Sequence, residues 1–199
     1  QEFILQEELN VYGAGLNLKI GAILRVSEKL KLGAALHTPT AYSIEETYST
    51  SLTTHFIEES FTERSNSNYF EYDLITPWKA ILSASSLLSN NILLSADYEI
   101  VDYSFSNMKS SQYTFNDENN IIQKLYTKTA NIRLGTEINL KPFIIRCGYS
   151  KYGSAFANKD YSKENYSFGL GINNGGYYLD VSYVLSQGNG EQLLYSEDY

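Results

Sequence analysis

The clearest pattern in the chain is a regular alternation of apolar and polar residues between Gly15 and His37. Apolar side chains occupy the even positions: Leu16, Leu18, Ile20, Ala22, Leu24 and Val26, and then Leu30, Leu32, Ala34 and Leu36. Small, polar and cationic residues fill most of the odd positions. Because successive side chains of a strand point to opposite faces, this period of two predicts two strands with one apolar face, joined by a tight turn at 27–29.

Two environments produce strands with such different faces. A soluble sandwich packs the apolar face against a second sheet and leaves the polar face in water. A transmembrane barrel turns the apolar face to lipid and the polar face to an enclosed lumen, in strands of about 10 residues. The first hairpin fits both environments, so the choice between them depends on the rest of the chain.

Alternation of this kind continues along the chain and predicts eight strands. They cover residues 15–26, 30–48, 70–88, 94–105, 130–139, 143–150, 166–173 and 177–185. Pro39 and Pro77 fall inside the second and third strands, where the missing N–H predicts a kink or bulge. On both sides of each proline we expect the even positions to stay on the apolar face. At 102–105 the alternation slips by one residue, which predicts a bulge.

Short and long connections alternate between these strands. Tight turns are expected at 27–29, 89–91, 139–142 and 174–176, and long polar segments at 49–68, 107–128 and 151–164. We expect a partly extended loop at 49–68, and a helical turn where the polar residues 116–119 precede an apolar face at 121–125. In an up-and-down meander every second connection lies at the same end, so all short turns gather on one side. That asymmetry is typical of outer-membrane barrels.

Charged residues in the middle of the strands lie on the polar face, where a barrel pairs them across a wet lumen. We expect these to face the lumen: Lys19, Arg25, Asp97, Glu99, Arg133, Glu137 and Arg146. On a sandwich the same residues form an ordinary solvated surface. Aromatic residues gather towards the long-connection ends of the strands, as in the girdle at a membrane interface. They are Tyr42, Tyr48, Phe70, Tyr72, Tyr98, Phe105, Tyr149 and Tyr166.

The composition narrows the range of functions. A net charge of −8 argues against a nucleic-acid partner, which requires a basic face. The 18 tyrosines suit strands and membrane interfaces, although a tyrosine-rich soluble β protein accounts for them nearly as well. The single cysteine, Cys147, excludes an intrachain disulfide, and no apolar run reaches the roughly 18 residues of a transmembrane helix. The sequence has no catalytic, phosphate-loop or metal-ligand motif, so we expect neither an enzyme nor a cofactor or metal.

Three strings carry a resemblance to a known family: 33–40 (GAALHTPT), 72–79 (YDLITPWK) and 96–104 (ADYEIVDYS). Together they resemble the outer membrane protein transport family of long-chain fatty acid and aromatic-hydrocarbon transporters, in its Bacteroidetes form. The resemblance implies a monomeric antiparallel barrel of about fourteen strands with an N-terminal plug. Residues 1–199 contain eight expected strands and no plug. We therefore expect a single segment of a transmembrane β-barrel, the C-terminal portion of a longer one, without the plug, the early strands and the last strand.

The resemblance also implies a function, namely passive diffusion of hydrophobic small molecules such as long-chain fatty acids through a bacterial outer-membrane barrel, with lateral release into the membrane. Candidate ligand contacts are His37, Trp78, Lys79 and Phe105, although as wall residues they serve more often as interface anchors or lumen fillers. The expected partners are the hydrophobic ligand, membrane lipid and lipopolysaccharide. The alternatives are a non-enzymatic β-sheet adhesin and a small structural outer-membrane barrel.

Overall fold

The computed structural model describes residues 2–56 and 59–190, which form two antiparallel sheets and two helices. The five-stranded sheet contains β1 (Glu2–Leu16), β4 (Ala41–His55), β5 (Ser60–Arg64), β6 (Asn68–Ile75) and β9 (Asn107–Lys109). The eight-stranded sheet contains β2 (Lys19–Arg25), β3 (Leu30–His37), β7 (Lys79–Ser89), β8 (Ile92–Asp102), β10 (Lys128–Leu140), β11 (Phe143–Tyr152), β12 (Lys163–Asn173) and β13 (Tyr178–Gly188). The helices are the 3-10 helix η1 (Tyr103–Phe105) and the α-helix α1 (Asn116–Leu125).

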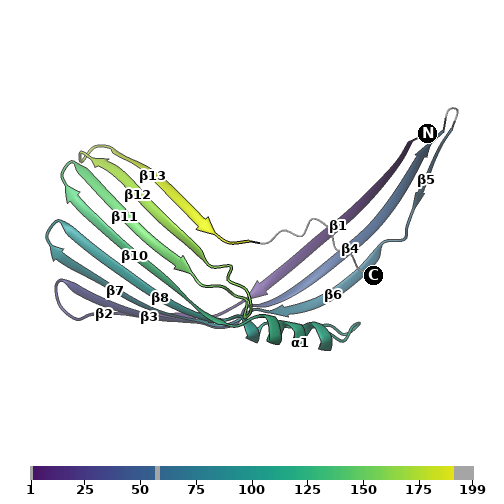
Figure 1. The fold of residues 1–199 in the computed structure, drawn as a ribbon, viewed down its shortest axis with the longest axis horizontal. Helices are drawn as coiled ribbons and strands as arrows, with labels where there is room; N and C mark the ends of the chain where they lie inside the picture. Colours follow the sequence, from purple (N-terminus) through teal and green to yellow (C-terminus); the bar gives the residue numbers. More distant parts are fainter. Residues whose placement is uncertain (1, 57–58, 191–199) are drawn as a thin grey trace.

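The chain runs up and down through adjacent strands. The pairs β1–β2, β3–β4 and β6–β7 are successive parts of three long strands that pass from one sheet into the other. Together with β8, β10, β11, β12 and β13 they make the eight strands expected from the sequence. Figure 1 shows the short turns of the eight-stranded sheet gathered at one end and the long connections at the other. The fold is thus an antiparallel up-and-down barrel wall, as expected.

The tight turns are formed by the residues that such turns favour. The Ser27 hydroxyl accepts hydrogen bonds from the N–H groups of Lys29 and Leu30 at 3.3 and 3.1 Å. Gly175, between β12 and β13, has a φ of 73°. Glycine adopts this left-handed conformation without the steric cost that other residues meet. These local features hold the strands in the register of their hairpins.

The eight-stranded sheet is a single layer whose apolar face is uncovered. In the described residues the buried apolar side chains are Val101, Phe115 and Ile144, together with Pro77 in one of the breaks between the sheets. Leu82 and Leu134, by contrast, are 59% and 48% exposed. In the described part of the chain, the two sheets pack no faces together. A soluble sandwich would bury these leucines against a second sheet, and the described residues do not pack in this way.

The two faces of the eight-stranded sheet differ in chemistry. We call the face that carries Leu24, Leu32, Leu82, Leu94 and Leu134 the outer face, and the opposite one the inner face. Register places all seven charged residues that we expected to face a lumen on the inner face: Lys19, Arg25, Asp97, Glu99, Arg133, Glu137 and Arg146. The alternation in the sequence therefore corresponds to an outer face that is mainly apolar and an inner face that carries these charges.

Breaks at 38–40 and 76–78 separate the two sheets in the second and third long strands. The strands remain connected across the breaks by threonines. The Thr40 N–H donates to the Thr76 hydroxyl at 3.0 Å, and the Thr76 N–H donates to the Thr40 carbonyl, also at 3.0 Å. The interruptions expected at the two prolines are confirmed.

The alternation does not keep its phase across these breaks. Tyr42 and Leu74, at even positions, line the same cavity as Lys19 and Lys79, at odd positions. Three residues lie outside the strands in each break, and beyond them the strand resumes with its faces exchanged. The expectation that the even positions stay on the apolar face is therefore wrong in β4 and β6. It misplaced Tyr42, Ile44, Tyr48, Phe70, Tyr72 and Leu74, which share the inner side.

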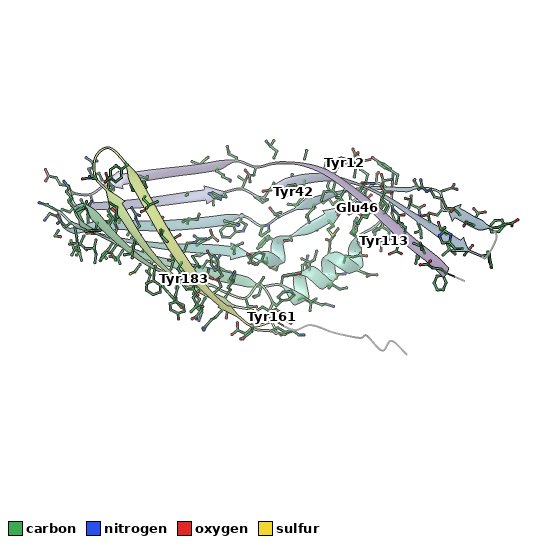
Figure 2. The ribbon with its side chains drawn as sticks, turned by 90° about the horizontal axis from the view of Figure 1, so that it is seen from above. Tyr12, Tyr42, Glu46, Tyr113, Tyr161 and Tyr183 are labelled. Atoms are coloured by element: carbon green, nitrogen blue, oxygen red, sulfur yellow. The ribbon has the colours of Figure 1, made fainter. Side chains whose placement is uncertain are left out.

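The expected aromatic girdle is correspondingly smaller. Tyr98, Tyr149 and Tyr166 lie on the outer face, where the rings of the last two are 5.3 Å apart. Figure 2 shows Tyr42 on the side of the sheet that faces α1, and Tyr12 on the opposite side of β1. The outer side of the five-stranded sheet carries acidic residues instead of leucines: Glu8, Glu45, Glu71 and Asp73. Only the eight-stranded sheet has an apolar outer face.

The strands extend further than the alternation predicted. β1 begins at Glu2 and pairs with β4 over its whole length, and β4 continues to His55 before β5 returns beside it. The Thr53 and Thr62 hydroxyls are 3.0 Å apart across this hairpin. The expected loop at 49–68 is therefore wrong over most of its length, because β-branched residues form strands even where no apolar alternation marks them.

The segment after β8 contains two short helices. The bulge expected at 102–105 is replaced by η1, where the Asp102 carboxylate accepts the Ser104 N–H at 3.2 Å. The expected helical turn is confirmed as α1, with Asp117 in its first turn and Lys124 in its last, which suits the helix dipole. Among the described residues, no helix is both long and apolar enough to cross a membrane.

Candidate functional site

A cavity of about 570 Å³ lies where the two sheets meet. Its walls come from the inner face of β2, β3 and β7, from the two breaks, and from the segment that contains η1 and α1. Its lining includes Lys19, His37, Lys79, Tyr42, Leu74, Tyr103, Ile122 and Tyr126. The cavity thus combines basic groups, phenol hydroxyls and aliphatic side chains.

Three basic residues form one row across the floor of this cavity. Lys19 lies directly opposite His37, and His37 directly opposite Lys79, on three adjacent strands. Lys19 is exposed, whereas His37 and Lys79 are half-buried. Side chains in directly opposite positions are about 5 Å apart at their Cβ atoms, so the row brings two ammonium groups and one imidazole close together. The row is therefore a site where an anion is favoured.

Tyr42 reaches the cavity because its neighbour has no side chain. Gly15 lies opposite Tyr42, and a Cβ atom on Gly15 would come within 2.5 Å of the Tyr42 ring. A Cβ atom on Gly13, two pairs further along β1, would meet its nearest atoms at an ordinary 3.5 Å. Glycine at position 15 therefore lets the ring lie flat on β1 at the edge of the cavity.

Helix α1 is fixed over the cavity by polar and aromatic contacts. The Asn119 side chain accepts the Met108 N–H at 2.8 Å and donates to the Met108 carbonyl at 2.9 Å. Phe115 is buried at the start of the helix, in contact with three rings, those of Phe70, Tyr72 and Tyr113. These contacts hold Ile122 and the following Tyr126 against the cavity.

The connection between β11 and β12 packs on the end of α1. The Phe156 ring lies 4.9 Å from the Tyr126 ring, and the Ala157 N–H donates to the Leu125 carbonyl at 2.8 Å. Hydrogen bonds from Ser162 lower the pKa of Asp160 in this loop. Burial, with a further contribution from the Glu99 carboxylate, raises the pKa of the cavity-lining phenol of Tyr103. At neutral pH that phenol is therefore a hydrogen-bond donor.

A buried carboxylate stands beside the cavity on the inner face. Glu99 is 7% exposed, accepts a hydrogen bond from Asn131 at 2.7 Å and forms an ion pair with Arg133 at 3.4 Å. The Arg133 guanidinium lies 5.5 Å from the centre of the Tyr152 ring. Lys79 interacts electrostatically with Glu99 as well. Glu99 therefore balances cations on both sides, and each of its two oxygens already accepts a hydrogen bond.

A second charged cluster lies on the inner face towards the short turns. Arg146 donates to Glu137 at 2.7 Å and to Asp180 at 2.8 Å, and it also reaches the Tyr178 hydroxyl. Tyr178 donates a hydrogen bond to Asp180 as well. The cluster joins β10, β11 and β13 across the inner face. Its charges are therefore paired within the cluster, and its contacts tie the three strands together.

The structure brings together two of the four residues that we expected to contact a ligand. His37 and Lys79 are neighbours in the cavity. Trp78 lies in the break beside Lys79 but is not among the lining residues, and Phe105 is 62% exposed in η1, beside a different recess. The expectation for Trp78 and Phe105 as ligand contacts thus stays a prediction without geometric support.

Several cavity residues were not expected from the sequence. Lys19 was predicted only as a lumen charge, and Tyr42 was predicted on the wrong face. Lys19 and His37 are symmetric about the turn at 27–29, so the pairing of those two residues follows from the hairpin alone. Tyr103, Ile122 and Tyr126 come from a connection whose path the alternation does not determine. Among the described residues no three His, Cys, Asp or Glu side chains gather in a metal-binding group.

Comparison with known proteins gives a result for the fold only. No protein-family model matches the sequence, and no curated protein matches it. Solved structures do match, and they give the chain the fold of the FadL-type barrel channels.

Two of these structures are the CymD monoaromatic hydrocarbon channel and a FadL homologue from Pseudomonas aeruginosa. The CymD channel matches with a TM-score of 0.55 and 13% identity, over 86% of this chain and 46% of that chain. The FadL homologue matches with a TM-score of 0.52 and 11% identity, over 91% of this chain and 61% of that chain. This chain therefore spans less than two thirds of either protein.

Proposed function

We propose that the chain forms part of the wall of a bacterial outer-membrane channel through which hydrophobic small molecules diffuse passively. The observation that carries the proposal is the cavity between the two sheets, with a basic row on its floor and aliphatic residues on its walls. The uncovered outer face of the eight-stranded sheet supports contact with membrane lipid, because leucines at this exposure are unfavourable in water. We propose lipopolysaccharide as a further lipid partner.

The lining of the cavity favours an amphiphile over a plain hydrocarbon. Leu74 and Ile122 offer apolar contact, while Lys19, His37 and Lys79 attract a negative group. A long-chain fatty acid has both parts, an acyl chain and a carboxylate. We therefore propose that the carboxylate binds at the basic row and that the acyl chain lies against the aliphatic side.

The breaks beside the cavity support lateral release into the membrane. At 38–40 and 76–78 the backbone ladder of the wall is replaced by a few threonine contacts. A wall is easiest to open where it has the fewest ladder hydrogen bonds. We propose a monomeric channel in which the ligand leaves sideways at this level, without enzymatic conversion.

The proposal predicts that filling the cavity stops transport. Ile122→Trp adds a bulky ring at the cavity lining, and we expect it to reduce the uptake of radiolabelled oleate several-fold in cells that depend on this channel. Ile121→Trp is the matched control, because Ile121 is the neighbouring helix residue, is 52% exposed and does not line the cavity. Both variants are first compared for their amount in the outer membrane.

Two results would contradict the proposal. One is undiminished uptake by the Ile122→Trp variant at normal expression. The other is an equal loss with Ile121→Trp, because this loss would place the effect in the helix and not in the cavity.

A further inference from the structure

We infer that the basic row selects an amphiphile whose head group carries two negative charges, of the phosphate monoester class, over one with a single carboxylate. This inference deepens the proposed function and rests on it. It starts from a mismatch between the charges in the cavity and the single charge of a fatty acid.

The cations at the cavity outnumber the anions that balance them. None of the described residues that line the cavity is acidic. The side chains of Lys19 and His37 form neither an ion pair nor a hydrogen bond with another described residue, and the two residues lie directly opposite each other. A single carboxylate would therefore balance one of the two ammonium groups of the row, Lys19 and Lys79, and leave the other dependent on Glu99.

The acidic groups nearby are already engaged. Glu99 interacts with Lys79, but it also pairs with Arg133 and accepts a hydrogen bond from Asn131. Asp97, the next carboxylate on the inner face, lies opposite Arg133 in the register. The carboxylate of Glu46 accepts the Tyr72 hydroxyl at 2.9 Å, further along the inner side. Thus these carboxylates do not neutralise the Lys19–His37 end of the row.

The hydrogen-bond donors around the row also suit a phosphate. Tyr42, Tyr103 and Tyr126 line the cavity, and none of their hydroxyl groups is hydrogen-bonded to another described residue. A phosphate monoester offers three terminal oxygens and carries close to two charges at neutral pH. It therefore accepts more of these donors, and balances more of the row, than the two oxygens of a carboxylate.

Calorimetric titration of the full-length protein in non-ionic detergent tests the inference with three probes of equal chain length: dodecyl phosphate, dodecanoate and dodecanol. We expect dodecyl phosphate to bind about tenfold more tightly than dodecanoate, and dodecanol to bind most weakly. Lys19→Gln is expected to remove most of the advantage of the phosphate. Lys31→Gln is the matched control, because Lys31 is also a lysine of the inner face but lies opposite Arg25, outside the cavity lining.

The outcomes separate this inference from the proposed function. If dodecanoate binds as tightly as dodecyl phosphate, the inference is overturned and the proposed function stands. If none of the three probes binds, the proposed function is overturned as well. Equal losses in the Lys19→Gln and Lys31→Gln variants would also overturn the inference, because they would reflect general attraction and not a site.

Discussion

Leu134→Arg is expected to lower the free energy of unfolding in a lipid bilayer by about 2 to 4 kcal/mol. Leu134 lies in the middle of β10 on the outer face, opposite Ala96 and Tyr149, and is 48% exposed. A guanidinium there would sit among acyl chains near the bilayer midplane, without water or a counter-ion. Urea titration of the protein folded into lipid vesicles measures the change.

The control for this prediction carries the same new charge on the other face. Ser83 lies on the inner face, opposite Gly33 and Asp97, where an arginine finds both space and a carboxylate. We therefore expect Ser83→Arg to change the stability by less than about 0.5 kcal/mol. Equal tolerance of both variants would show that the outer face does not meet lipid.

Glu99→Leu is expected to cost about 1 to 3 kcal/mol of stability. Glu99 is the most enclosed charged side chain among the described residues, and its removal leaves Asn131 and Arg133 without their partner on the inner face. The estimate stays below that for a fully buried pair because Arg133 retains 36% exposure and can be hydrated. The same urea titration in vesicles gives the measurement.

Asp97→Asn provides the comparison for Glu99. Asp97 lies two residues before Glu99 on the same face, and it forms no ion pair or hydrogen bond in the described part of the chain. We expect a change of less than about 0.5 kcal/mol for this variant. A similar loss in both variants would mean that the net charge of the inner face, and not the Glu99 contacts, determines the stability.

The eight strands and their turns could be predicted from the sequence because apolar and polar residues alternate along most of their length. Most outer positions are apolar, so the alternation at 30–36 or 130–138 leaves little choice of strand or register. Pro39 and Pro77 also indicated the breaks correctly, since neither residue can donate to the ladder.

The full length of the strands in the five-stranded sheet could not be predicted in the same way. Residues 49–55 of β4 and the strand β5 are mostly polar on both faces, so the apolar alternation that marks a strand is missing there. The exchange of faces at the breaks could not be predicted from the sequence either. It depends on how many residues leave the extended conformation, and a proline indicates an interruption but not its length.

Only part of the candidate site was predicted. Its residues are brought together by a hairpin, by the pairing of two distant strands and by the packing of a helix. The Lys19–His37 pair follows from one hairpin. The His37–Lys79 pair depends on the contact between β3 and β7, which are separated in the sequence by β4, β5 and β6. The position of Tyr126 depends further on α1 and its contacts with the loop after β11. The local alternation of residues determines the first of these contacts but neither of the other two.

The central claim is that alternate residues of the eight-stranded sheet meet lipid and an aqueous interior. Spin labels placed one at a time at positions 130–138 of β10, in a Cys147→Ser background, test it through collision with oxygen, which concentrates in lipid, and with a water-soluble nickel complex. We predict oxygen maxima at the even positions and nickel maxima at the odd positions. High nickel access at the even positions, or the absence of a period of two, would contradict the account.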